Sequence, residues 1–193
     1  ICMFDQYGTV VDMQSGLTEV AAPYLRGKGW TGDPHSFVTW WRRTHYENSM
    51  IDALLHKAHT PYREIGHRSL AFVLERAGIP YGMDEVRELV AAIERLRPFP
   101  EVPAALRKLR DAGFRLLTLT DNLLEVQTRQ LTHGGIADLF ERRFSADGVK
   151  HHKPARAAYA YFEREMAVEP SQVCMIACHT WDTLGAVAAG WEA

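Results

Sequence analysis

The feature that most constrains the fold is the apolar run at the start of the chain, Ile1 to Phe4, which ends at Asp5. Four consecutive apolar residues bounded by an acid and a glycine turn predict a short strand buried on both faces. Such strands belong to parallel α/β sheets, and ligands bind in the crevice at their carboxyl ends. We therefore expect Asp5 to serve chemistry, although an ordinary acid that ends a strand gives the same local pattern.

The second half of the chain alternates between strand-like and helix-like patterns. Strands are predicted at 114–119, 140–146 and 173–178. Helices are predicted at 104–112, 125–132, 155–166 and from residue 183 onward. Strands that alternate with helices predict an α/β fold with a doubly wound parallel, Rossmann-like sheet and right-handed crossovers.

The stretch between the first strand and this region is helical throughout. Apolar residues at helical spacing predict four helices, at 14–27, 37–55, 61–74 and 84–96. We therefore predict an α/β core, residues 1–13 and 98–193, interrupted by an all-helical insert, residues 14–97. The chain starts without Met and stops where a helix would be ending, so we expect a fragment whose core is truncated at the C-terminus.

Composition indicates an ordinary soluble globular protein. The chain is 47% apolar with a net charge of -2, and it has no basic patch that would suggest nucleic acid. Its apolar runs fall short of the roughly 18 residues of a bilayer span, and we expect a cytoplasmic protein without a membrane partner. The three cysteines, Cys2, Cys174 and Cys178, lack a C-x-x-C pair, so we expect reduced thiols.

The stretch Asp5-Gln6-Tyr7-Gly8-Thr9 resembles the first motif of the haloacid dehalogenase superfamily, in which the Asp is a covalent nucleophile. The Thr9 hydroxyl can hold the carboxylate in one rotamer. The resemblance implies that Tyr7 and Thr9 also contact substrate. Phosphatases of the superfamily place a second Asp two residues after the nucleophile, to protonate an alkoxide leaving group. Here that position is Tyr7, and halide leaves without a proton. The motif is therefore similar to that of the L-2-haloacid dehalogenase (type II) branch.

A second motif follows the strand predicted at 114–119. The resemblance implies that Thr120 hydrogen-bonds a substrate carboxylate and that Asn122, one place later than the family's Asn, also contacts substrate. Asp121 departs from the family, because a second acid would weaken anion binding unless it points away or Asn122 takes the polar role. Alternatively, Thr120 or Asp121 simply caps the following helix.

A third motif contains Lys153-Pro154. The resemblance selects Lys153 over Lys150 as the lysine that keeps Asp5 ionised and screens its charge. It also implies that Tyr159 contacts substrate. A solvated surface lysine is the alternative. His151 and His152 are expected at the surface, since two histidines without a third ligand make a poor metal site.

The fourth motif is His179-Thr180-Trp181-Asp182. The resemblance implies that Asp182 lies near Lys153 and activates water, and that Trp181 walls the pocket. Asp182 also fits a helix N-cap. The family often has Asn in place of His179 and Ser in place of Ala177, so either His179 shares the handling of water or the site is tuned to another substrate.

One arginine of the helical insert resembles a further family residue. In Trp41-Arg42-Arg43, the resemblance implies that Arg42 receives the departing halide, because a guanidinium is always charged and weakly hydrated. Arg43 lies about 100° further round a helix and is expected to face water.

The resemblance implies a hydrolytic dehalogenase that converts short (S)-2-haloalkanoic acids to (R)-2-hydroxy acids through an aspartyl ester. The expected partner is a small 2-haloacid, and a homodimer is also expected. No metal or cofactor is expected, since the single Asp182 makes a weak case for magnesium. Two alternatives stay open: a magnesium-dependent small-molecule phosphatase of the same superfamily, and a non-catalytic relative that binds a carboxylate or a partner protein.

Overall fold

A parallel sheet forms the centre of the computed structural model, which describes residues 1–55 and 59–193. Within these residues the sheet has four strands in the order β3-β2-β1-β4. All neighbouring pairs are parallel, and Met3 of β1 lies between Leu117 of β2 and Met175 of β4. The strands are β1 (Cys2–Phe4), β2 (Leu116–Thr120), β3 (Arg142–Ser145) and β4 (Cys174–Ile176).

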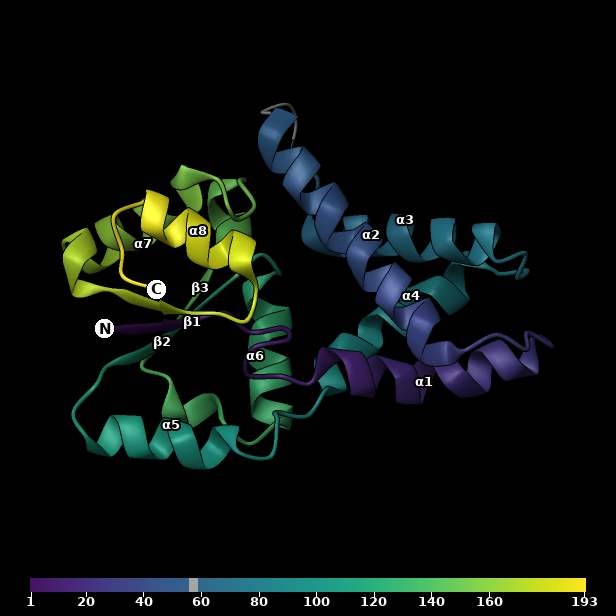
Figure 1. The fold of residues 1–193 in the computed structure, drawn as a ribbon, viewed down its shortest axis with the longest axis horizontal. Coiled ribbons are helices and arrows are strands. Elements are labelled where there is room, and N and C mark those ends of the chain that lie inside the picture. Colours follow the sequence, from purple (N-terminus) through teal and green to yellow (C-terminus); the bar gives the residue numbers. More distant parts are fainter. Residues whose placement is uncertain (56–58) are drawn as a thin grey trace.

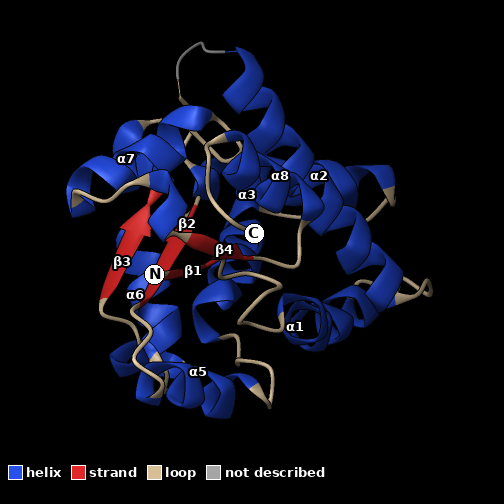
Figure 2. Cartoon of the chain, turned by 60° about the vertical axis from the view of Figure 1, so that its left-hand side comes forward, coloured by secondary structure: helices blue, strands red, loops and turns tan. Residues whose placement is uncertain are grey.

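Helices cover both faces of this sheet. On one face α5 (Val102–Asp111) and α6 (Leu124–His133) pack against side chains such as Phe4, and on the other α7 (Arg156–Met166) and α8 (Thr180–Ala188) pack against side chains such as Met3. Figures 1 and 2 show the two helical layers with the sheet between them. Buried strands that alternate with amphipathic helices favour this packing. The doubly wound α/β fold predicted from the sequence is confirmed.

The chain from β1 to α5 folds into helices that pack together beside the sheet, and we call residues 14–97 the helical unit (Figure 1). The first helix shows why, since Leu17, Ala21 and Leu25 repeat every four residues and are buried along one stripe. Its helices are α1 (Met13–Gly27), α2 (Pro34–Leu55), α3 (Tyr62–Arg76) and α4 (Met83–Ala91), followed by the 3₁₀ turn Ala92–Arg95. Among the described residues, no helix is both long and apolar enough to cross a bilayer.

The predicted strand 173–178 is shorter in the structure because the chain leaves the sheet after Ile176. The backbone N–H of Cys178 donates to the Thr9 hydroxyl at 3.0 Å instead of to a neighbouring strand. The next helix begins at Thr180, three residues earlier than predicted. The loop after β4 is therefore tied to the loop after β1, where the candidate site lies.

Candidate active site

The loops that follow β1, β2 and β4 meet at the carboxyl edge of the sheet, beneath the helical unit. Asp5 directly follows β1, and its backbone N–H donates to the carbonyl of Ile176 in β4 at 3.0 Å. Thr120 ends β2, and His179 precedes α8. The parallel sheet thus gathers the residues of the first, second and fourth motifs, as the sequence predicts.

Lys153 lies buried between two of the carboxylates, with 1% of its surface exposed. Its ammonium donates to Asp5 Oδ1 at 3.0 Å, to Asp182 Oδ2 at 2.5 Å and to the Leu119 carbonyl at 3.1 Å. These three acceptors use all three ammonium protons. Burial lowers the pKa of Lys153, but the charges of Asp182 and Asp5 outweigh it and raise that pKa well above its ordinary value. The site therefore has a fixed positive charge.

Asp5 is buried and held at both oxygens. The Thr9 hydroxyl donates to Oδ2 at 2.8 Å, and Nδ1 of His179 lies 3.3 Å from the same oxygen. Burial alone would raise the pKa of Asp5, but the Lys153 charge and the His179 hydrogen bond lower it well below its usual range. An ionised carboxylate fixed in one orientation can act as a nucleophile.

Asp182 is fully buried on the other side of Lys153. The Tyr159 hydroxyl donates to its Oδ1 at 2.8 Å, while Lys153 occupies Oδ2. Burial raises the pKa of Asp182, and Lys153 opposes this shift while Asp5 adds to it. A carboxylate with a raised pKa accepts a proton more readily, which suits a general base.

His179 is a cation at neutral pH. Burial lowers its pKa, but hydrogen bonds with Asp5 and Cys178 outweigh burial and raise that pKa to about 9. Its ring also lies 5.5 Å from the ring of Trp181. His179 therefore donates to the Asp5 carboxylate at neutral pH, and it cannot then accept a proton from water.

Side chains of the helical unit and of the sheet loops line a small cavity of about 40 Å³ beside Asp5. Its walls combine aromatic rings from the helical unit with polar groups from the sheet loops. The lining residues are Asp5, Tyr7, Met13, Arg42, His45, Tyr46, Tyr62, Thr120, Asp121, His179 and Trp181.

Arg42 brings a positive charge from α2 to this cavity. Its Nη1 donates to Gln14 Oε1 at 2.8 Å. Its buried Nε has no hydrogen-bond partner among the residues that the structure describes. The loop after β1 passes close by, and a Cβ on Gly8, whose φ is +91°, would lie 3.3 Å from Arg42 Nη2 and 3.0 Å from His179 Cε1. Arg42 therefore retains a buried donor in a cavity of a size for a small anion.

Three residues predicted to contact substrate do not line the cavity. Thr9 holds Asp5 instead, as the sequence also predicts. Asn122 donates to the Tyr7 hydroxyl at 3.4 Å and accepts from the Leu123 N–H, so it supports the wall. Tyr159 was predicted to touch substrate, but it is fully buried behind Asp182, because its hydroxyl satisfies that buried carboxylate.

The sequence left two possibilities for Asp121, that it points away from the anion pocket or that Asn122 takes the polar role, and the first is wrong. Asp121 lines the cavity, and its Oδ1 accepts the backbone N–H of Lys153 at 2.7 Å. Burial raises its pKa. The capping alternatives are also wrong, because Leu123 is the N-cap of α6 and His179 is the N-cap of α8.

The prediction for His152 is wrong as well, since it is fully buried between the core and the helical unit. Its Nε2 lies 2.8 Å from the Thr60 carbonyl oxygen, and this hydrogen bond offsets the free-energy cost of burying the polar ring. Lys150, the lysine that was not selected, lies at the surface and pairs with Asp147. Sequence reasoning missed Tyr62 and His45, whose isolated positions on the helical unit gave no signal.

The space between Asp5 and Asp182 suits a divalent cation poorly. The ammonium of Lys153 already fills the space between Asp5 and Asp182 and contacts an oxygen of each. A divalent metal bridging the same two oxygens would add two positive charges beside those of Lys153 and His179. The donor set therefore fits an anionic substrate better than a metal ion.

Comparisons with known proteins agree along nearly the whole chain. The model of the haloacid dehalogenase-like hydrolase family matches residues 1–190. Haloacetate dehalogenase H-2 from Moraxella sp. (strain B) is 27% identical over 189 residues, which cover 98% of this chain and 81% of that protein. (S)-2-haloacid dehalogenase 1 from Pseudomonas sp. (strain CBS-3) is 26% identical over 191 residues, which cover 99% of this chain and 81% of that protein.

The fold is also similar to solved structures. L-2-haloacid dehalogenase from Xanthobacter autotrophicus superposes with a TM-score of 0.87 at 25% identity, covering 98% of this chain and 74% of that chain. The L-2-haloacid dehalogenase RSc1362 gives a TM-score of 0.88 at 26% identity, covering 98% and 82%.

Proposed function

We propose that this chain, which belongs to the haloacid dehalogenase-like hydrolase family, hydrolyses the carbon–halogen bond of short (S)-2-haloacids and forms (R)-2-hydroxy acids. One observation carries the proposal: an ionised Asp5, held in one orientation, lines a small cavity. Tyr7 lines the same cavity in the place of the second Asp that protonates the leaving group in phosphatases. Relatives similar over nearly the full length of this chain are named (S)-2-haloacid dehalogenases. The cavity volume of about 40 Å³ favours short acids.

The first step is a displacement at carbon. A carboxylate oxygen of Asp5 attacks the carbon that bears the halogen, from the side opposite to it, and an ester bond forms as the carbon–halogen bond breaks. The halide leaves with the bonding electron pair, and the configuration at the carbon is inverted. Arg42 is placed to receive it, since a guanidinium is always charged and less hydrated than an ammonium. We propose that Thr120, which lines the same cavity, binds the substrate carboxylate.

The second step hydrolyses the ester. Water attacks the carbonyl carbon of the Asp5 ester as Asp182 takes one of its protons. Lys153 stabilises the oxyanion that forms on the former Asp5 oxygen. The intermediate collapses, and the departing 2-oxygen takes the proton from Asp182. Asp5 then releases the second proton of the water to solvent and regains its ionised state. The hydroxyl oxygen of the first product therefore comes from Asp5.

The arrangement supports this reaction over the phosphatase alternative. A phosphate monoester must expel an alkoxide, which needs a proton, and burial raises the pKa of Tyr7 well above its ordinary value. Lys153 also takes the place that a cation would need between Asp5 and Asp182. The names of the relatives likewise favour turnover over a non-catalytic binding role.

Release of inorganic halide from (S)-2-chloropropionate tests the proposal. We expect halide from the (S) acid, (R)-lactate as the product, and no detectable turnover by Asp5→Asn. The (R) acid serves as the matched substrate control. Absence of halide from every short 2-haloacid, or an Asp5→Asn variant as active as the parent, would refute the proposal. Strong magnesium-dependent release of nitrophenol from its phosphate ester would support the phosphatase instead.

Three further expectations stay proposals. We propose that residues 14–97 act as a cap over a core of residues 1–13 and 98–193, which the mixed lining of the cavity supports. Free cysteines without a disulfide are consistent with a cytoplasmic location. Exposed apolar side chains on α2 and α3, including Leu54, Leu55 and Phe72, support a homodimer.

A further inference from the structure

A second cluster of chemically active side chains lies where the helical unit meets the core, outside the cavity that holds Asp5. Asp52 comes from the last turn of α2, and His59 precedes α3, while His152 comes from the core loop before Lys153. Asp52 Oδ1 lies 3.8 Å from Nδ1 of His59 and 3.8 Å from Nε2 of His152. The two imidazole rings are 4.6 Å apart. Three potential ligand atoms therefore converge on one point.

His59 is oriented as a metal ligand would be. Its Nε2 lies 2.7 Å from Asp147 Oδ1, so the N–H is on Nε2 and the lone pair is on Nδ1. That Nδ1 is buried, and it has no hydrogen-bond partner within the described part of the chain. Histidine ligands usually donate their second ring N–H to a carboxylate, which fixes the tautomer and makes the ligand more basic. The unpartnered atom is the one that faces Asp52.

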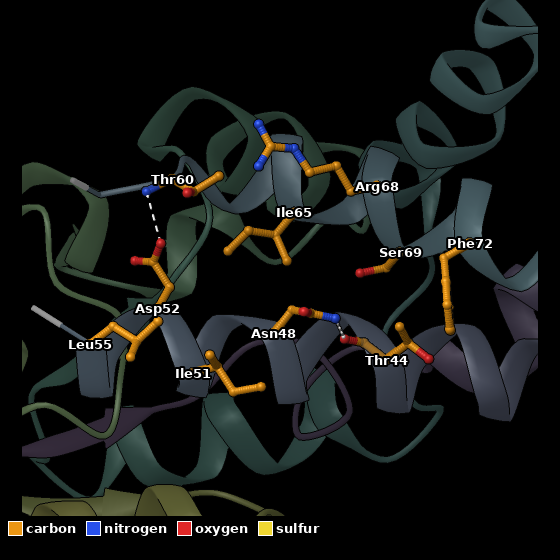
Figure 3. Close-up of a pocket in the computed structure, with 10 residues that line it drawn as sticks. All are labelled: Thr44, Asn48, Ile51, Asp52, Leu55, Thr60, Ile65, Arg68, Ser69 and Phe72. Atoms are coloured by element: carbon orange, nitrogen blue, oxygen red, sulfur yellow. Dashed lines mark hydrogen bonds between the residues drawn. The ribbon is translucent and has the colours of Figure 1, made fainter. Parts of the chain in front are cut away.

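Asp52 is also held with one oxygen turned toward the histidines. The backbone N–H of Thr60 donates to its Oδ2 at 3.1 Å, as Figure 3 shows, and this leaves Oδ1 for the cluster. Asp52 and Thr60 line a cavity of about 410 Å³ between α2 and α3. Asp52 is therefore reachable from this cavity.

His152 has a carboxylate behind it too. Its Nε2 lies 2.8 Å from the Thr60 carbonyl oxygen, and its buried Nδ1 is unpartnered among the described residues, 3.9 Å from Asp121 Oδ1. If Nε2 binds a cation, its proton can move to Nδ1, beside the Asp121 carboxylate. The Thr60 carbonyl oxygen then loses its donor and can turn to the same cation.

We propose that Asp52, His59 and His152 form a site for a divalent transition-metal ion, with Zn²⁺ as the ion that fits best. Two imidazoles and one carboxylate are a common ligand set for zinc, and the Thr60 carbonyl oxygen or a water completes a tetrahedron. Bonds of about 2.0–2.1 Å place tetrahedral ligand atoms roughly 3.3 Å apart. The two 3.8 Å separations therefore need to close by about half an ångström, and the separation between the two histidine nitrogens, which lies within 4.8 Å, by up to about 1.5 Å.

A metal bound here would tie the helical unit to the core. Asp52 and His59 belong to the helical unit, whereas His152 is the neighbour of Lys153 in the core. The site is separate from the proposed chemistry, because none of its three ligands lines the cavity in front of Asp5. Its expected effect is greater thermal stability of the folded chain in the presence of the ion.

Titration of the chelator-treated full chain with Zn²⁺ and Co²⁺ tests the site. We expect one ion per chain, a rise in the unfolding temperature, and the intense visible bands of tetrahedral Co²⁺. His59→Gln should weaken Zn²⁺ binding at least 100-fold, and Asp147→Asn, which removes only the outer carboxylate, should weaken it about 10- to 100-fold. Lys150→Ala is the matched control, since it removes the other partner of Asp147 and should leave the affinity unchanged.

Several results would overturn the proposal. One is that neither His59→Gln nor Asp147→Asn changes the affinity for Zn²⁺. Another is a near-ultraviolet thiolate–Co²⁺ band that disappears in Cys178→Ser, because the ion then binds at Cys178 and His179. Circular dichroism checks that each variant is folded. If His59→Gln is unfolded, Asp52→Asn takes its place, and an unchanged affinity in that variant would equally reject the site.

Discussion

Replacing Lys153 by Met should remove the positive charge that lies between two buried acids at the centre of the active site. Methionine keeps the length and the apolar stem of lysine but removes the ammonium. The ammonium contacts Asp5 at 3.0 Å and Asp182 at 2.5 Å. Without it, those two carboxylates and Asp121 share one buried region with no lysine charge.

The size of the effect follows from these distances. With an effective dielectric constant of about 20, two unit charges 3.0 Å apart attract by about 5–6 kcal/mol. The cost of burying Lys153 itself offsets part of this energy, and removing one member of a buried ion pair typically costs about 3–5 kcal/mol. We therefore expect the free energy of unfolding to fall by about 3–5 kcal/mol near pH 7.

The loss should depend on pH, with a sign that the charges determine. In the parent chain the pKa of Asp5 is lowered, so its contribution to stability is present above its unfolded pKa of about 3.9 and is lost as the pH falls. In Lys153→Met, burial raises the pKa values of Asp5 and Asp182 above their unfolded values. The variant then regains stability as the pH falls through those raised values, and the difference between the two proteins should shrink by at least half near pH 4.5.

Urea unfolding of both proteins at the two pH values measures this difference. Lys28→Met is the matched control, because Lys28 pairs with Glu85 at 2.7 Å but in contact with solvent, and it should change stability little at either pH. Activity should fall by about 10³-fold, since the oxyanion also loses its donor. A loss of stability under 1 kcal/mol near pH 7, or an equal loss at both pH values, would refute the electrostatic reasoning.

Two other predictions concern residues around the same cluster. Because the pKa of His179 is about 9, kcat/KM should fall above that pH as the donor to Asp5 is lost, and His179→Asn should lack this limb of the pH profile. The stability from this contact should be full below pH about 6.5 and lost as the pH rises through about 9, which urea unfolding can measure. In Gly185→Ala the new methyl would lie 2.5 Å from the Tyr159 hydroxyl, so Tyr159 must move away from Asp182. We expect kcat to fall about tenfold and stability by about 1–3 kcal/mol, and an unchanged kcat would show that the position of Tyr159 does not matter.

The fold was predictable because its signals are local. A four-residue apolar run that ends in Asp5 has few structures open to it, and Asp5 does follow a buried parallel strand. The apolar stripe at Leu17, Ala21 and Leu25 likewise identifies one helix without knowledge of its partners. Strand ends were less predictable, because Cys178 leaves the sheet to bond Thr9, a residue far away in the sequence.

The candidate site was predictable only in part, for reasons that lie in tertiary structure. Lys153 could be chosen over Lys150 only because Lys153-Pro154 matches the family motif, since both are lysines of one polar loop. Tyr159 was predicted to contact substrate and Asp121 to lie near an anion pocket, but sequence spacing does not say which side of a buried carboxylate a ring will occupy or which way an acid will point. His152 looked like a surface residue, because its burial comes from contact with Thr60 in another part of the fold.

The central claim is that Asp5 forms a bond to substrate carbon, and a single turnover in heavy-oxygen water tests it most directly. Enzyme in excess is mixed with (S)-2-chloropropionate. Mass spectrometry then measures the mass of the hydroxy acid product and, separately, that of the peptide that contains Asp5. An ester intermediate predicts that the heavy oxygen enters the Asp5 carboxylate while the first hydroxy acid stays unlabelled. Label in the hydroxyl group of that first product, with Asp5 unlabelled, would contradict the account.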